Sequence, residues 1–102
     1  MADDDLERET TELLQRLVRL NTVNPPGNER PAQELLGGLL RDAGFEVELL
    51  GRTEERPNLV ARLRGAGDGP TLCLLSHVDT VLADAAEWQR DPWSGDVVGG
   101  EL

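Results

Sequence analysis

The spacing of hydrophobic residues changes from helical to alternating near residue 45, and this change limits the possible folds more than any other feature. Residues 4–20 and 29–43 carry apolar side chains at 3.6-residue spacing, as amphipathic helices do. Residues 45–50 and 58–64 alternate apolar and polar side chains, which is typical of half-exposed strands. Residues 71–75 ("TLCLL") are apolar on both faces, so we expect a central strand covered on each side. Two N-terminal amphipathic helices followed by about three strands predict a layered α/β domain with a partial sheet.

The second helix has recognisable end signals. Asn28 is predicted to be its N-cap, and Pro31 falls in its first turn, where the missing N–H is not needed. Gly44 is the expected C-terminal stop. Upstream, the segment Pro25-Pro26-Gly27 favours a tight turn, because proline presets φ and glycine accepts a positive φ.

Length and charge exclude several classes of protein. The 102 residues allow one domain at most, and 20 acidic residues against 10 basic ones give a net charge of −10. Such a charge repels nucleic acid and anionic membranes, so neither is an expected partner. No apolar stretch approaches the ~20 residues that cross a bilayer, and the acidic N-terminus is unlike a signal peptide. With a single cysteine excluding an internal disulfide, the sequence predicts a soluble cytoplasmic protein.

The segment "SHVDTV" at residues 76–81 contains the only histidine of the chain. A serine-histidine-aspartate triad is rejected, because neighbours on a strand point to opposite faces and Ser76 cannot reach the ring of His77. Cys73 lies inside the apolar run, so we expect a buried, protonated and inert thiol. Neither residue is therefore a candidate nucleophile.

Metal binding is compatible with the same geometry. In an extended backbone His77 and Asp79 project to one face, and a ligating histidine commonly donates its other N–H to a carboxylate. The end of a buried strand is also where α/β proteins place their sites. The alternative is a histidine that caps a core strand, with Asp79 starting the next turn. From these residues alone, a histidine that caps a core strand is the commoner case.

Four blocks of sequence together point to a family. The blocks are "TVNPPGNE", "ERPNLVARLRG", "LLSHVDTV" and "EWQRDPWSGDVVGGEL", and they extend over nearly the whole chain. In order and spacing they resemble the N-terminal part of the zinc-dependent amidohydrolase and exopeptidase family. This family includes acetylornithine deacetylase, succinyl-diaminopimelate desuccinylase, aminoacylase-1 and the carboxypeptidase G type enzymes. Ser76, Leu82 and Gly99-Gly100 depart from the usual residues (glycine, proline and Asp-Gly) but not at the metal-binding atoms.

The resemblance implies roles for two residues. His77 matches the histidine that binds one of two zinc ions, and Asp79 matches the acidic residue that orients it, so Asp79 is the candidate catalytic residue. Family members use the metal pair to activate a water that attacks the amide of an N-acyl amino acid or small peptide. Zinc is therefore the expected cofactor, with cobalt or manganese as possible replacements.

The resemblance also implies that residues 1–102 are the N-terminal portion of a larger metallohydrolase catalytic domain. The other metal ligands, the general base and the lid or dimerisation domain are expected beyond Leu102. We therefore expect the chain alone to be inactive, and a homodimer only where that domain is present. The alternative is a noncatalytic remnant or interaction module that associates through unpaired strand edges.

The residues after Thr80 have a simpler explanation than ligand binding. Scattered acidic loop residues in a chain of charge −10 are expected to be solvated rather than bound to metal. The two tryptophans are expected to anchor the loop to the domain. These residues are Asp84, Glu87, Asp91 and Asp96, with Trp88 and Trp93.

Overall fold

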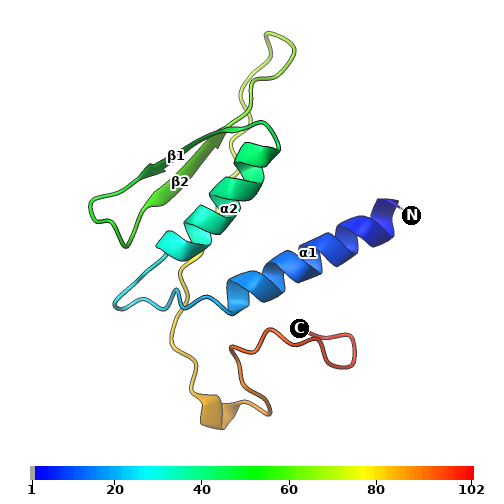
Figure 1. Cartoon of the computed structure of the whole chain (residues 1–102), viewed down its shortest axis with the longest axis vertical. Helices are drawn as coiled ribbons and strands as arrows, with labels where there is room; N and C mark the ends of the chain where they lie inside the picture. The colour runs from blue at the N-terminus through cyan, green and yellow to red at the C-terminus, as the bar shows by residue number, and fades with distance from the viewer. Residues whose placement is uncertain (1) are drawn as a thin grey trace. The chain divides into compact units, whose positions relative to one another are not determined.

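The computed structural model describes residues 2–102 and has two α-helices, a two-stranded sheet and one short 3-10 helix (Figure 1). The chain divides into two compact units. One is Thr22–Val81, and the other consists of the residues on either side of it. The α/β class is confirmed, and the candidate site lies within Thr22–Val81.

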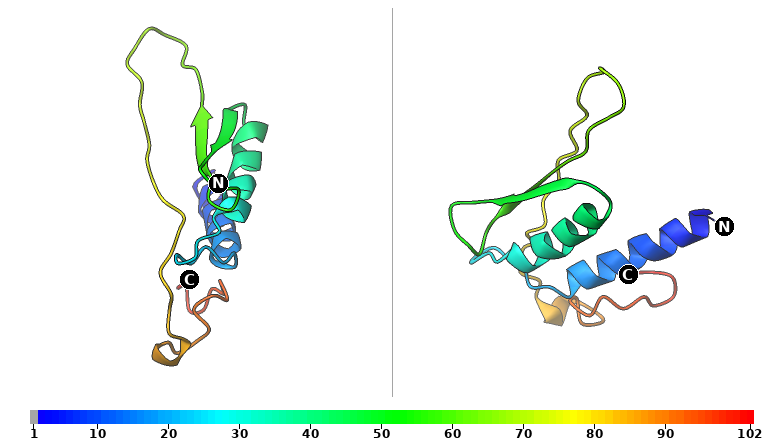
Figure 2. Two further views of the ribbon diagram at one scale, coloured as in Figure 1. Left: turned by 90° about the vertical axis from the view of Figure 1, so that its left-hand side faces the viewer. Right: turned by 45° about the horizontal axis from the view of Figure 1, so that its top comes forward.

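Unit Thr22–Val81 is built on a helix packed against a hairpin. Helix α2 (Arg30–Asp42) covers one face of strands β1 (Glu46–Leu50) and β2 (Asn58–Arg62), which pair antiparallel (Figures 1 and 2). The predicted alternation is confirmed in β1, where Val47 and Leu49 are half-buried between exposed neighbours. Val47 and Leu49 share the face of β1 that α2 covers because successive side chains of a strand point to opposite sides, and Leu50 is accordingly 51% exposed.

Two small residues bring α2 close to the sheet. Ala32 is only 1% exposed, and Gly37 is also buried. A Cβ added at Gly37 would lie 3.2 Å from a methyl carbon of Val47 and 3.3 Å from one of Leu59. The glycine is therefore useful at this position for close packing, despite its low helix propensity.

The predicted start of α2 is wrong by one residue, and its predicted stop is confirmed. The N-cap is Glu29 rather than Asn28, and Glu29 forms no side-chain cap. Its carboxylate binds Arg56 instead, while the backbone N–H of Arg30 donates to the carbonyl of Glu55 at 3.1 Å. Pro31 does lie in the first turn, and the helix is followed by Gly44 at φ +95°. Contacts distant in sequence thus replace the local cap.

The predicted third strand is wrong. Within the described residues the sheet has two strands, and residues 71–75 join neither of them. Leu72, Leu74 and Leu75 are 83%, 88% and 94% exposed, and Cys73, predicted to be buried, is exposed as well. The left view of Figure 2 shows this segment running apart from β2. A strand forms only where a neighbouring backbone accepts its hydrogen bonds, and apolar composition cannot supply one.

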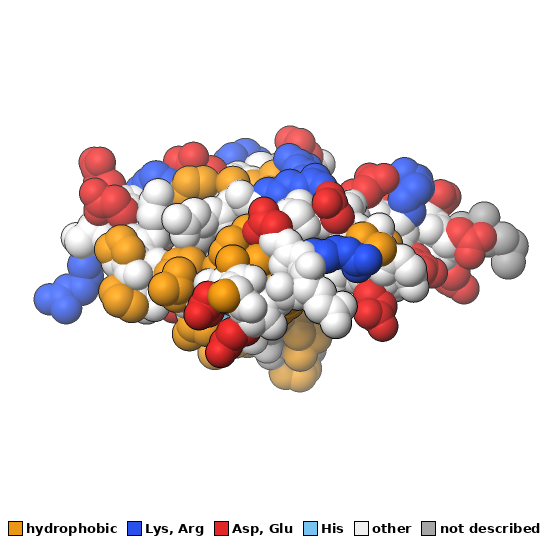
Figure 3. Space-filling view, turned by 90° about the horizontal axis from the view of Figure 1, so that it is seen from below, with side chains coloured by type: hydrophobic (Ala, Val, Ile, Leu, Met, Phe, Trp, Pro, Cys, Tyr) orange, Lys and Arg blue, Asp and Glu red, His pale blue; other side chains and the backbone are white. Residues whose placement is uncertain are grey.

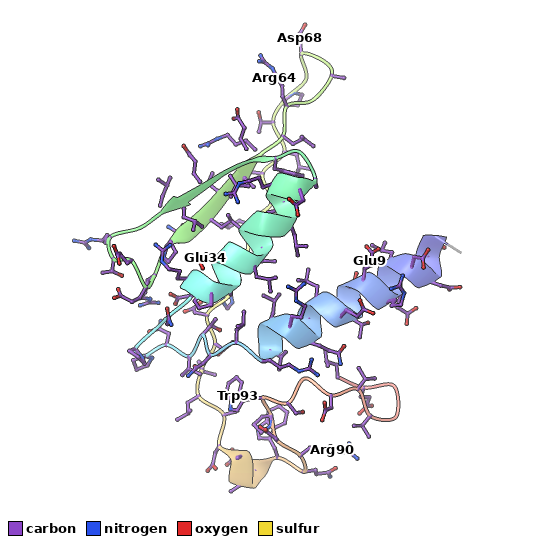
Figure 4. All side chains as sticks on the ribbon, in the orientation of Figure 1. Glu9, Glu34, Arg64, Asp68, Arg90 and Trp93 are labelled. Atoms are coloured by element: carbon purple, nitrogen blue, oxygen red, sulfur yellow. The ribbon has the colours of Figure 1, made fainter. Side chains whose placement is uncertain are left out.

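The loop between β2 and residues 71–75 separates them. It consists of residues 63–70, which include three glycines, and Figure 4 labels Asp68 at its tip. All of residues 65–70 are exposed. The loop leads into this unpaired segment rather than into a strand that pairs with β2.

The second unit is organised around helix α1 (Ala2–Val18). Leu13, Leu17 and Val18 of the predicted apolar stripe are half-buried, whereas Leu6 and Leu14 are 64% and 47% exposed. Three aspartates occupy the first turn, where negative charge favours the helix dipole. At the other end, Gln15 and Arg19 donate side-chain hydrogen bonds to the carbonyls of Gly95 (2.7 Å) and Ser94 (2.8 Å), which fix the C-terminal loop.

Apolar side chains remain at the surface of the described residues, where Figure 3 shows them interspersed with acidic and basic ones. Among the aliphatic and aromatic side chains described within residues 2–102, proline aside, only that of Ala32 is buried. No helix within residues 2–102 has the length and apolar character needed to span a membrane.

Candidate metal-ligand site around His77

The structure brings His77 and Asp79 together. Nδ1 of His77 lies 3.0 Å from Oδ1 of Asp79 and 3.0 Å from the carbonyl oxygen of the same residue. Both of these atoms are acceptors, so we assign the proton of the neutral ring to Nδ1. Nε2 then carries the lone pair, and the side chain of His77 is 84% exposed. This arrangement offers one nitrogen donor to an incoming cation.

The second oxygen of the Asp79 carboxylate also has partners. Oδ2 accepts a hydrogen bond from the side-chain amide of Asn24 at 3.1 Å, and Nη2 of Arg56 lies 4.0 Å away. The hydrogen bond from Asn24, followed by that from His77, lowers the pKa of Asp79 below its usual range. The carboxylate is therefore ionised at neutral pH and acts as an acceptor on both of its oxygens.

Backbone pairing fixes the loop that carries Asn24 to the segment that carries Asp79. Val23 and Thr80 form a parallel bridge, in which Thr80 N donates to Thr22 O at 3.1 Å and Asn24 N donates to Thr80 O at 2.9 Å. The hydroxyl of Thr22, which is 3% exposed, donates to the carbonyl of Val78 at 2.8 Å. Three hydrogen bonds thus place Asn24 beside a residue 55 positions later.

An ion pair lies next to this bridge. The guanidinium of Arg56 binds Glu29 in a bidentate manner, with Nε 3.1 Å from each carboxylate oxygen and Nη2 2.9 Å from Oε1. Glu29 is 6% exposed, while the side chain of Arg56 is 41% exposed. The hydrogen bonds from Arg56 lower the pKa of Glu29 against the opposing effect of burial.

The predicted turn at Pro25-Pro26-Gly27 allows this ion pair to form. Gly27 has φ +84° and donates its N–H to the carbonyl of Val23 at 2.9 Å. A Cβ at this position would lie 2.4 Å from Nε of Arg56. Glycine therefore suits the backbone conformation, and any other residue here would have to displace the guanidinium of Arg56.

His77 and Asp79 line an open hollow of about 670 Å³ in the same unit. Glu29, the N-cap of α2, and Gln33 within the helix form part of its wall, and the connection between β1 and β2 forms another part. The exposed Nε2 of His77 therefore belongs to a concave surface, as ligand sites generally do.

The described residues do not complete a metal centre. Within residues 2–102, no three or more histidine, cysteine, aspartate or glutamate side chains are grouped so that they could hold a metal ion. A catalytic zinc has about three protein ligands, so the His77 and Asp79 arrangement fits one ligand and its orienting carboxylate only. Ser76 forms no hydrogen bond to His77 in this part of the chain, in keeping with the rejection of a triad.

Three of the four acidic side chains predicted to be solvated in the C-terminal loop have a partner within the described residues. Asp84 accepts from the N–H of Ala86 at the start of the 3-10 helix Ala85–Glu87, and Asp91 accepts from the N–H of Trp93. Asp96 lies 3.6 Å from Arg19, and Glu87 is exposed. Trp93 is half-buried, as an anchor should be, but Trp88 is 58% exposed, so its predicted anchoring role is wrong.

Sequence reasoning missed three residues around Asp79: Asn24, Glu29 and Arg56. The sequence patterns single out none of the three as a site residue. Their contacts span 55 and 27 positions, which no periodicity within a short window can reveal. An amide and an ion pair beside a histidine motif could have been found only by knowing which loops meet.

A carboxylate-oriented histidine with a free Nε2, presented in a hollow of an α/β unit, is typical of metal-binding proteins. Sequence comparison relates the chain to one group of enzymes. Over 95 residues the chain is 42% identical to the succinyl-diaminopimelate desuccinylase of Methylobacterium sp. (strain 4-46), an alignment that covers 88% of this chain and 23% of that protein. The enzyme of the same name from Xanthobacter autotrophicus is 40% identical over 96 residues, which cover 88% of this chain and 24% of the relative.

The chain is a relative of succinyl-diaminopimelate desuccinylases, and the predicted resemblance to the amidohydrolase and exopeptidase family that includes them is confirmed. It spans about a quarter of the length of these curated relatives. No family model and no solved structure matches it.

Proposed function

We propose that this chain contributes His77 as a metal ligand, and Asp79 as the carboxylate that orients it, to the centre of an amide hydrolase of the desuccinylase type. The observation that supports this most directly is the 3.0 Å contact between Nδ1 of His77 and Oδ1 of Asp79, which leaves Nε2 available in the hollow. The similarity to desuccinylases supplies the reaction type.

Zinc is the proposed metal, with cobalt or manganese as substitutes, because imidazole suits all three. When bound, such a metal polarises an amide carbonyl and makes water a stronger nucleophile. Within the described residues, the chain's own part is to present Nε2, to hold the ring through Asp79 and to form one wall of the hollow. The other ligands and the general base are proposed to come from outside these 102 residues.

The proposed substrates are amino acids whose amine carries an acyl group. The names of the relatives specify a succinyl group on diaminopimelate, and we extend only the class of bond to this chain. The net charge of −10 argues against nucleic acid as a substrate.

A chimera tests this function. The matching segment of the Methylobacterium desuccinylase is replaced by this chain, and hydrolysis of the relative's own substrate is measured with zinc present. We expect an active chimera, loss of activity to background in His77→Ala, and a decrease of about 10- to 100-fold in Asp79→Asn. Asp84→Asn, on the C-terminal loop, is the matched acidic control and should keep full activity.

A direct metal titration provides a second test that needs no catalysis. Because His77 is the only histidine, zinc added to the 102-residue chain should shift its ring signals in NMR spectra, weakly and reversibly, as expected for a single ligand. The proposal fails if these signals do not move, or if the His77→Ala chimera is as active as the unmodified one.

One observation favours the alternative of a noncatalytic interaction module. Leu72, Leu74 and Leu75 are almost fully exposed on a segment whose backbone pairs with no strand in the described residues. A segment of this kind can be covered by strand addition from a partner. Sedimentation of the chain at increasing concentration distinguishes the two: association lost in Leu74→Asp, together with no response to zinc, would favour the module.

A further inference from the structure

The carboxylate of Asp79 contacts His77 through one oxygen, and its other oxygen lies beside Asn24 and Arg56. We propose that Asn24 and the Glu29–Arg56 ion pair are positioning residues, which fix Asp79 so that the ring of His77 keeps its proton on Nδ1 and its lone pair on Nε2. The proposal rests on the proposed function only in that the arrangement would prepare Nε2 to bind a metal. The arrangement itself can be measured without metal or substrate.

Asn24 provides the direct contact. Its amide donates to Oδ2 at 3.1 Å, while Oδ1 lies 3.0 Å from Nδ1 of His77, so the carboxylate is held between two donors. Rotation of the carboxylate would lengthen at least one of these contacts. Asn24 is itself held by its backbone hydrogen bond to Thr80 at 2.9 Å. Because the amide is uncharged, it stabilises the carboxylate without forming an ion pair that would draw the carboxylate away from His77.

Arg56 acts at longer range. Its Nη2 lies 4.0 Å from Oδ2 of Asp79, which is too far for a hydrogen bond, so it contributes by charge. Glu29 determines that distance, because it binds Nε and Nη2 of the guanidinium and is itself only 6% exposed. A guanidinium released from Glu29 would be free to bind the Asp79 carboxylate in a bidentate manner and displace His77 from it.

Removal of the two contacts should therefore have the same consequence by different routes. Loss of Asn24 loosens the carboxylate, whereas loss of Glu29 frees a competitor for it. Both changes weaken the contact between Asp79 and the ring, while removal of Arg56 itself should have a smaller effect. A purely structural role of these residues would change stability without changing where the ring carries its proton.

The test is the tautomer of His77, determined from the nitrogen chemical shifts of the imidazole in the full chain labelled with ¹⁵N-histidine. The spectra are recorded at a pH where the ring is neutral, and the chain's single histidine makes the assignment unambiguous. We expect Nδ1–H to be the major form in the native chain and the minor form in Asn24→Ala. Glu29→Gln should shift the population in the same direction, and Arg56→Met should shift it least.

Matched controls come from the same loops. Asn28 and Arg52 are exposed, and no hydrogen bond or ion pair involves their side chains within residues 2–102. Asn28→Ala and Arg52→Met should therefore keep the native tautomer ratio. Amide spectra of each variant show whether the fold is retained.

A native tautomer ratio in folded Asn24→Ala would overturn the proposal. If that variant does not fold, Asn24→Asp retains the shape of the side chain but cannot donate, and it is judged by the same ratio. In the native chain, the side-chain amide of Asn24 should also show one proton shifted by its hydrogen bond, unlike that of Asn28. The proposed function fails separately, through a ring that does not respond to zinc while the tautomer depends on Asn24 as described.

Discussion

Two apolar stretches of the unit Thr22–Val81 differ in what happens to them on folding. The hairpin β1–β2 pairs with itself, with Val47 opposite Ala61, and is covered by α2. Residues 71–75 are more continuously apolar, yet they have no strand partner and their leucines are exposed. Only a few residues later, Thr80 is held by backbone bonds to residues 22–24. Strand-like sequence thus becomes ordered pairing only where a second backbone is in reach.

The largest expected contrast is in thiol reactivity. Cys73 is exposed, so we expect the native chain to react with a thiol reagent at nearly the rate of the unfolded chain. In a Cys73→Ser background, Ala32→Cys places a thiol on the buried side of α2, at a position that is 1% exposed. This thiol should react roughly a hundredfold more slowly, because the unit must open first. Equal protection of the two thiols would contradict the comparison.

Thr22→Val should weaken the contact that holds the end of the extended segment, at Val78, to the loop that begins at Thr22. The variant removes the donor to the Val78 carbonyl at a position that is 3% exposed, which should lower the free energy of unfolding by about 1–2 kcal/mol. Urea denaturation measures the loss. Thr22→Ser keeps the hydroxyl and should recover most of it, and Thr53→Val, at an exposed position, should change stability by less than about 0.5 kcal/mol. A Thr22→Val variant as stable as the native chain would show that the bridge contributes nothing.

Two adjacent glycines in α2 test how closely this helix packs on the β1–β2 hairpin. A Cβ at Gly38 meets nothing within 4 Å, so Gly38→Ala should raise the free energy of unfolding by about 0.5–1 kcal/mol through helix propensity alone. Gly37→Ala gains the same propensity, but its methyl lies 3.2 Å from Val47, and the gain should be reduced or reversed. Thermal unfolding of the two variants gives the difference. Equal stabilisation would mean that the helix does not pack closely on the hairpin.

The smallest expected effect is the pH dependence from Glu29, because Arg56 is 41% exposed and solvent screens the pair. The pKa of Glu29 is lowered from its ordinary value of 4.5, so its stabilising contribution is fully present above that pH. The contribution is lost as the pH falls through the lowered pKa of the folded state. The difference in unfolding free energy between the native chain and Glu29→Gln should therefore be constant near neutrality and shrink in acid. Glu55→Gln is the exposed control, and a difference that grew in acid would contradict the assigned sign.

The predictions that succeeded and failed can be separated by the range of the interactions involved. Both helices and the β1–β2 hairpin follow from patterns within one segment, as does the stop at Gly44. The contact of His77 with Asp79 also follows, since an extended backbone places residues i and i+2 on one side. The N-cap at Asn28 failed because Arg56 engages the neighbouring Glu29 across 27 positions.

Sequence alone determined the family, the helix-then-strand order and the identity of the histidine and carboxylate that face each other, because each depends on residue order within a short stretch. Only the tertiary structure decided that residues 71–75 stay uncovered, that Asn24 holds Asp79, and that Glu29 restrains Arg56. These outcomes depend on which distant backbones meet. No single segment of the sequence specifies such a contact, because the contact depends on two distant segments together.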